Sequence, residues 1–213
     1  MSIELGLRQR KKQLARRLIS QTASRLFADR GFDAVTVAEV ARAADFSEVT
    51  VFTYFPTKED LFFGGMESFE EKLVAAVRDR AVGESVLRAF RRPLLDGCKN
   101  LGVKERAEAI ARAGALINAS PALQTREREI SAHYAQLLAE LLASESHAAP
   151  DSVELWGVAS ALMSIHRALA VYVRGRVLAG RQGPKLVADA RAQATRAFAR
   201  LERGLANYSI RAA

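Results

Sequence analysis

Residues 36–61 read TVAEVARAADFSEVTVFTYFPTKEDL, and this stretch contains two closely spaced helix starts, at Thr36 and Ser47. Thr36 followed by Glu39 is a capping-box pattern, in which the hydroxyl accepts from the third helical amide while the carboxylate reaches back. Asp45 falls in the turn between the two helices, and Asp adopts the left-handed conformation more readily than most residues. Two short capped helices joined by a tight turn predict a helix-turn-helix.

The two short helices are expected over residues 37–44 and 48–54, and each neighbouring segment is also helical by pattern. Apolar residues recur at spacings of three and four from Ala15 onward, and this first helix should stop at Gly31. A fourth helix should run from Lys58 to about Arg80 as one amphipathic rod. In a helix-turn-helix the second helix enters the DNA major groove while its neighbours contact the backbone.

The second short helix carries residue types that suit contact with base pairs. Glu48, Val49, Thr50 and Thr53 lie near its start or along one face, and threonine offers a hydroxyl to a base edge and a methyl group to thymine. The helix starts at Thr36 and Ser47 point backbone amides at an anion in front of them. We therefore expect this segment to bind double-stranded DNA.

In the order and spacing of these parts, residues 12–62 resemble the TetR family of bacterial transcriptional regulators. Leu26-Phe27 and Gly31-Phe32 fit the same pattern. The resemblance implies an all-α homodimer with a three-helix DNA-binding head and a larger helical body that binds a small molecule and dimerises through its last two helices. It assigns phosphate contacts to Thr36, Ser47, Tyr54 and Lys58, and groove-facing positions to Thr50 and Thr53.

Two residues depart from the family pattern. Phe52 stands where the family often has a phosphate-contacting tyrosine, so that hydroxyl contact is missing here. Asp45 stands where glycine is usual, which implies some strain in the turn. Together with the helix-turn-helix argument, the expected DNA-binding residues are Thr36, Ser47, Glu48, Val49, Thr50, Thr53, Tyr54 and Lys58.

The remainder of the chain also shows helical periodicity, so the expected fold class is all-α with about nine helices. The expected domains are a DNA-binding head over 1–56 and a ligand-binding and dimerisation body over 57–213. Within the body, helices are expected at Ser85 onward (with a kink at Pro93), 104–119, 121 to about 144, 151–179 and 184 to about 208.

The last two of these helices form an antiparallel hairpin that could pair with its copy in a four-helix interface. The residues spaced to build this seam are Ala159, Leu162, Met163, Ala170, Ala194, Phe198, Leu201 and Leu205. Candidate contacts for a small molecule in the body are Phe90, Leu95, Leu116, Ile117, Tyr134, Trp156, Met163 and His166. The alternative for each of these side chains is that it packs in the hydrophobic core and contacts no ligand. Ser120-Pro121-Ala122-Leu123 and His166-Arg167 also resemble a TetR subgroup with acyl-CoA-like ligands.

The composition of the chain bears on its disulfides, its partners and its cellular location. The chain has 213 residues, a formal net charge of +8 and one cysteine, Cys98, which excludes an intrachain disulfide. The basic surplus favours polyanionic partners, although the bases of residues 171–213 also suit a solvated helix face. No signal peptide is readable, and the apolar stretch 161–180 is interrupted by His166 and three arginines, so a cytoplasmic protein without membrane contact is expected.

These residues leave three classes of function to distinguish. The first is a ligand-responsive regulator, a repressor released from a palindromic operator by a small apolar or amphipathic effector. The second is an architectural or protein-partner-controlled DNA-binding protein whose body is filled and takes no ligand. The third is an enzyme, which the sequence disfavours because it has no P-loop, G-x-G-x-x-G, G-x-S-x-G or H-E-x-x-H motif. No cofactor is expected, and the three histidines lack metal-ligand spacing.

Overall fold

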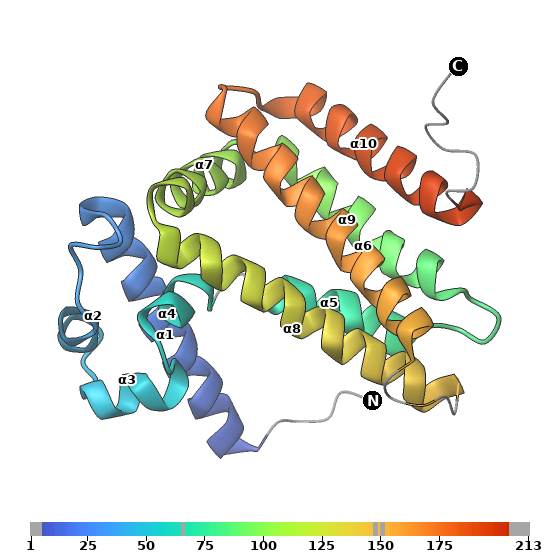
Figure 1. Cartoon of the computed structure of the whole chain (residues 1–213). Helices are drawn as coiled ribbons and strands as arrows, with labels where there is room; N and C mark the ends of the chain where they lie inside the picture. Colours follow the sequence, from blue (N-terminus) through green and yellow to red (C-terminus); the bar gives the residue numbers. More distant parts are fainter. Residues whose placement is uncertain (1–5, 65–66, 147–148, 150–151, 205–213) are drawn as a thin grey trace. The chain divides into compact units, whose positions relative to one another are not determined.

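The computed structural model describes residues 6–64, 67–146, 149 and 152–204, and within these ranges it contains α-helices, one 3-10 turn and no strand (Figure 1). The helices are α1 (Leu7–Arg30), α2 (Val37–Ala43), α3 (Glu48–Tyr54), α4 (Lys58–Phe63), α5 (Glu67–Arg78), α6 (Val86–Lys99), α7 (Lys104–Ala119), α8 (Pro121–Ser146), α9 (Val153–Leu178) and α10 (Gly183–Arg203), with the 3-10 turn η1 (Asn100–Gly102) between α6 and α7. The all-α prediction is confirmed.

The chain divides into two compact units. The head unit comprises residues 1–68 together with 116–127, and the body unit comprises 69–115 together with 128–213. The expected boundary at residues 56/57 therefore differs from the observed one, which places α4 in the head unit. The reason is aromatic packing, since the Phe62 ring of α4 lies 6.1 Å from Phe27 and 6.0 Å from Phe32, centroid to centroid.

The expected single helix from Lys58 to about Arg80 is wrong in one respect. Two helices occupy this stretch, α4 and α5, with residues 65–66 outside the described ranges, and this raises the count above the expected nine. Gly64 follows α4 directly, and a Cβ atom there would collide with the ring of Phe55. The close approach of α4 to the end of α3 thus requires glycine at this position.

The turn between α2 and α3 has the predicted left-handed residue. Asp45 has φ 60°, and among the described residues no other non-glycine residue has a positive φ. The Phe46 amide donates to the Ala41 carbonyl at 2.9 Å, which closes the turn behind α2. At the end of α1, Gly31 has φ 85°, and its amide donates to the Phe27 carbonyl, as expected for a helix stop.

In the body unit, α9 and α10 lie side by side and α10 also packs on α6 (Figure 1). The buried face of α10 presents Leu186, Ala190, Ala194 and Phe198, and the Phe198 ring lies 6.4 Å from that of Phe90 on α6. Cys98 is buried in this core, its thiol donates to the Leu94 carbonyl at 3.4 Å, and burial raises its pKa. A buried thiol of this kind packs as a small apolar residue.

Most of the residues predicted to form the dimerisation seam were assigned wrongly. Ala159, Leu162, Met163, Ala194 and Phe198 are all buried within the single chain, so they form its own core. Ala170 is exposed, Leu201 is half-buried and Leu205 lies outside the described residues. Helical spacing identifies an apolar face, but it does not say whether that face meets the same chain or a second copy.

By length and composition alone, α9 is one helix apolar enough to cross a membrane, with 28% of its most apolar window buried. That observation is weak evidence for a membrane span, because core helices of soluble proteins meet the same criterion. Here α9 packs against α10 and α6, and Arg174 is buried along it.

Candidate nucleic-acid interface

The start of α2 is fixed by the predicted capping box. The Glu39 amide donates to the Thr36 hydroxyl at 3.2 Å, and the Thr36 amide donates to the Glu39 carboxylate at 2.8 Å. Arg30 at the end of α1 forms an ion pair with the same carboxylate at 2.8 Å. The Thr36 amide and the Arg30 side chain lower the pKa of Glu39 to about 2. The Thr36 hydroxyl and the α2 amides behind it are therefore held in a defined direction.

The start of α3 is capped by Ser47. Its hydroxyl accepts from the Thr50 amide at 3.1 Å and lies 2.8 Å from the Thr50 hydroxyl. Ser47 is exposed and Thr50 is half-buried, so the hydroxyl pair lies at the edge of the helix. This arrangement orients both side chains without any partner molecule.

One side of α3 is buried and the other is exposed. Val51 within the helix and Phe55 directly after it are buried, with exposed fractions of 0% and 1%. On the other side Glu48, Val49, Phe52 and Thr53 are all exposed, and the apolar Val49 is 77% exposed. The helix is thus anchored by its inner face while its outer face is free for contact.

The hydroxyl of Thr53 already has one partner within the helix. It donates to the Val49 carbonyl at 2.8 Å. A threonine whose proton is engaged in this way has acceptor capacity and a methyl group left for a ligand. Thr53 is therefore suited to accept from an exocyclic amino group of a base or to touch a thymine methyl.

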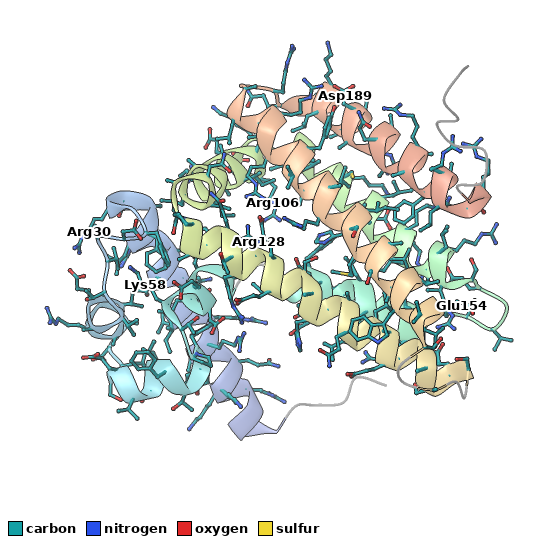
Figure 2. All side chains as sticks on the ribbon, viewed as in Figure 1. Arg30, Lys58, Arg106, Arg128, Glu154 and Asp189 are labelled. Atoms are coloured by element: carbon teal, nitrogen blue, oxygen red, sulfur yellow. The ribbon has the colours of Figure 1, made fainter. Side chains whose placement is uncertain are left out.

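Two cations are held close to the predicted interface by aromatic rings. Lys58 is labelled in Figure 2. Its ammonium lies 4.4 Å from the centre of the Phe32 ring and donates to the Asp33 carbonyl at 3.4 Å. Arg16 lies over Phe55 at 4.8 Å and donates to the Tyr54 carbonyl at 3.4 Å. Cation–π contact keeps such a charge at the surface in a restricted position.

Arg16 was not among the residues singled out from the sequence. It belongs to the basic run of residues 8–17, and that run marked the region without distinguishing one arginine from its neighbours. Its contact with the end of α3 depends on Phe55, which lies 39 positions further along the chain. Tyr54, predicted as a phosphate contact, is half-buried.

Residues 19–64 match the family model described as bacterial regulatory proteins, tetR family. This part of the chain is therefore similar to the DNA-binding region of TetR-family regulators. The match covers α2, α3 and α4 and the second half of α1, so it coincides with the helix-turn-helix and its supporting helices.

Two curated relatives are described as HTH-type transcriptional regulators. The chain is 33% identical over 85 residues to the transcriptional regulator TcmR of Streptomyces glaucescens, covering 40% of this chain and 38% of that protein. The match spans less than two-fifths of the length of each curated relative. The shared sequence is thus limited to part of either protein.

Two solved structures share the fold over nearly their whole length. NalD of Pseudomonas aeruginosa, the secondary repressor of a multidrug efflux pump, gives a TM-score of 0.54 at 19% identity, covering 88% of this chain and 96% of that one. FadR of Thermus thermophilus, a TetR-family repressor solved with lauroyl-CoA, gives a TM-score of 0.52 at 21% identity. The match covers 93% of this chain and 97% of that one. At these identities the likeness concerns the fold alone.

The residues predicted to line a ligand pocket have different degrees of burial in the structure. Phe90 and Met163 are fully buried, and Tyr134 is 7% exposed against the ring of His133, so these three occupy core positions. Trp156 is 38% exposed on α9, and Leu95 lines an open groove beside α10.

The remaining three predicted pocket residues lie in different units. Leu116 and Ile117 belong to the head unit, whereas His166 belongs to the body unit. The His166 ring lies 5.5 Å from the Phe69 ring, and burial lowers its pKa to about 4. A neutral imidazole against an aromatic ring is compatible with an apolar environment at this point of α9.

Proposed function

We propose that this TetR-family protein is a sequence-specific repressor that binds a palindromic operator as a homodimer and is released by a small apolar or amphipathic effector. The observation that carries the DNA-binding part is the outer face of α3. Its exposed side chains project from a helix anchored by Val51 and Phe55, and capped helix starts at Thr36 and Ser47 lie beside it. That arrangement suits a major groove flanked by phosphates.

The proposed contacts divide into two classes. Thr36, Ser47, Tyr54 and Lys58 contact phosphates, because they are hydroxyl groups or a cation near helix starts and ends. A second set on α3 reads base edges, and it comprises Glu48, Val49, Thr50 and Thr53. Val49 suits a thymine methyl group, since it is apolar and 77% exposed.

Substitutions in the two classes should have different effects. Lys58→Ala is expected to weaken binding to all sequences and to reduce the salt dependence of log K by about one unit, because one phosphate contact is lost. Val49→Ala and Thr53→Ala are expected to change base preference, each costing about 1–2 kcal/mol of discrimination at one position. Enrichment of bound duplexes from a random pool, followed by titration in 50–200 mM salt, measures both.

Arg181→Ala is the matched control for charge, because Arg181 is an exposed cation in the turn before α10 of the body unit. It should leave both quantities unchanged. If the random pool gives no enriched sequence while random DNA is bound tightly, the protein is an architectural binder and the regulator proposal fails. If all four variants change specific and random binding equally, α3 is not the reading helix.

The proposed homodimer rests on an exposed apolar face of α9. Val153, Trp156, Val171 and Leu178 are 85%, 38%, 51% and 42% exposed. At 100° per residue their positions fall within about 60° of one another around the helix. Large apolar side chains that share one exposed face of a helix favour a protein contact. A second copy related by a two-fold axis would cover this face and present two α3 helices to one duplex.

Val171→Arg is expected to convert the dimer to a monomer, because a charge on this face would be buried at the interface without a partner. Val103→Arg is the matched control, since Val103 is also 51% exposed and precedes α7. Sedimentation velocity at micromolar concentration distinguishes the two. Equal masses for both variants and the unaltered protein would show that α9 does not form the interface.

The effector class is proposed from the family and from one structural relative. FadR of Thermus thermophilus was solved with lauroyl-CoA, a ligand with an apolar chain and a polar head. A ligand can weaken DNA binding only if it binds the conformation that does not bind DNA more tightly than the conformation that does. The loss of DNA affinity is limited by that difference. Titration of the operator complex with acyl compounds of graded length tests this, and operator affinity independent of every compound would remove the effector from the proposal.

A further inference from the structure

An open groove of about 330 Å³ lies in the body unit between α6 and α10 (Figure 1 shows the two helices). Its lining is charged rather than apolar. The groove is formed by Glu84, Arg88, Arg91, Arg92, Leu95, Asp96 and Arg191. Four guanidinium groups therefore face two carboxylates, which leaves a local positive excess.

Two of the four arginines are held in place by the protein itself. Arg191 of α10 donates to the Leu95 carbonyl of α6 at 2.8 Å, a contact that ties the two helices together. Arg92 forms an ion pair with Glu84 at 3.3 Å. Each guanidinium has five N–H donors, so both retain donors for a ligand while their positions are restricted.

The two other arginines make no side-chain hydrogen bond or ion pair within the described part of the chain. Arg88 is exposed and Arg91 is half-buried, and they are three positions apart on α6. Residues at this spacing are neighbours on a helix surface, and like charges there repel each other. A bound anion would remove that repulsion.

The carboxylates of the groove are already engaged by cations. Lys99, by its hydrogen bond, and then Arg191 and Arg92, by their charges, lower the pKa of Asp96. Glu84 accepts from the Ala81 amide at 3.4 Å as well as pairing with Arg92. Glu84 thus pairs with Arg92 and Asp96 pairs with Lys99, and neither acid forms an ion pair with Arg88 or Arg91 within the described residues.

We propose that this groove binds a small phosphorylated molecule with adjacent phosphate groups, held by Arg88 and Arg91 with Arg92 and Arg191 as a preformed support. Guanidinium groups bind phosphate oxygens through paired, charge-assisted hydrogen bonds. The volume is within the usual range for a small-molecule site. This site is separate from the apolar effector proposed above, and it does not depend on DNA binding by the head.

A compact anion fits the groove better than a nucleic-acid backbone does. The negative charges of Asp96 and Glu84 lie among the arginines, and an extended row of phosphates would pass close to both. A diphosphate can instead engage Arg88 and Arg91 on one turn of helix. The shared chemistry is a pair of neighbouring phosphates, whether inorganic or attached to a nucleoside.

Isothermal titration calorimetry of the full-length protein with pyrophosphate, ADP and monophosphate in 0.1 M salt tests the proposal. We expect pyrophosphate and ADP to bind more tightly than monophosphate. Arg88→Ala/Arg91→Ala should weaken both by at least about tenfold, because two charge-assisted contacts are lost. The matched control is Arg106→Ala/Arg181→Ala, which removes two exposed cations of the body unit outside the groove and should change affinity less than about twofold.

A second variant, Leu95→Glu, keeps the arginines and adds a carboxylate inside the groove; it should also abolish binding while the helical circular dichroism signal is retained. Equal loss in the groove and control variants would show diffuse charge attraction and overturn the site. The absence of any phosphate binding by the unaltered protein would also overturn the proposed site. If a duplex displaces ADP through the same residues and binds more tightly than it, the groove is a nucleic-acid surface and the proposal is wrong.

Discussion

Arg126→Ala is expected to lower the free energy of unfolding by about 2–3 kcal/mol, because it leaves a buried carboxylate without its cation. Asp60 is 6% exposed, and Arg126 of α8 lies 2.8 Å (Nε) and 2.7 Å (Nη2) from its Oδ1. The estimate lies below that for a fully buried pair, since the Arg126 side chain is 33% exposed and water can reach the site. Urea denaturation followed by circular dichroism measures the change.

The two members of this pair should respond unequally to removal. Asp60 also accepts from the Thr57 amide at 3.0 Å, as part of the capping box that starts α4. Asp60→Asn can retain that acceptor and leaves an arginine that can turn to solvent, so it should cost less than Arg126→Ala. Leaving a buried charge unpaired costs more free energy than leaving a charge that can reach solvent unpaired.

Asp60→Asn/Arg126→Met is the informative double variant. It removes both charges and keeps most of the volume, so we expect it to recover at least about half of the loss caused by Arg126→Met alone. Additive losses in the double variant would show that the two side chains do not stabilise the protein through each other. Arg112→Met is a suitable control, because its ion pair with Glu108 is 3.8 Å long and both side chains are largely exposed.

The head could be predicted closely from the sequence because its signals are local. The boundaries of α3, the cap at Ser47 and the left-handed Asp45 all depend on residues within a few positions of one another. Capping and turn chemistry act over such distances. The exposed face of α3 follows from the same helix period that buries Val51.

The missed features depend on contacts between distant segments. The need for glycine at position 64 reflects the nearby ring of Phe55, and the Asp60–Arg126 pair joins residues 66 positions apart. The apolar residues of α9 and α10 were recognised as a seam, but which face meets the chain's own core depends on how α6 packs on them. A single sequence gives the period of such a helix and does not identify its neighbours.

The same limit applies to the groove between α6 and α10. Its arginines appeared in the sequence as part of a general basic surplus, with the bases of residues 171–213 assigned to a solvated face. Arg191 becomes part of a defined site because it donates to Leu95, 96 positions earlier in the chain. The net charge of the sequence predicts an attraction to anions. A binding site further requires that several of the charged side chains lie close together in the folded protein.

Acidification from pH 7.5 to 5 is expected to destabilise the protein through His166. Burial lowers its folded pKa to about 4, whereas an unfolded histidine titrates near 6.5. The unfolded chain therefore binds more protons between these values, so the contribution is complete above about pH 6.5 and is lost as the pH falls toward 4. The loss is at most about 1.4 kcal/mol per pH unit and about 3 kcal/mol in total.

His166→Gln separates this contribution from that of the carboxylates, because it removes the titrating group and keeps a polar side chain near Phe69. Urea denaturation at pH 7.5, 6.5, 5.5 and 5.0 should give a shallower decline in stability for the variant than for the unaltered protein. His133→Gln is the control, since His133 is exposed on α8, and it should follow the unaltered protein. Parallel pH profiles for all three proteins would show that His166 is protonated as readily in the folded chain as in the unfolded one.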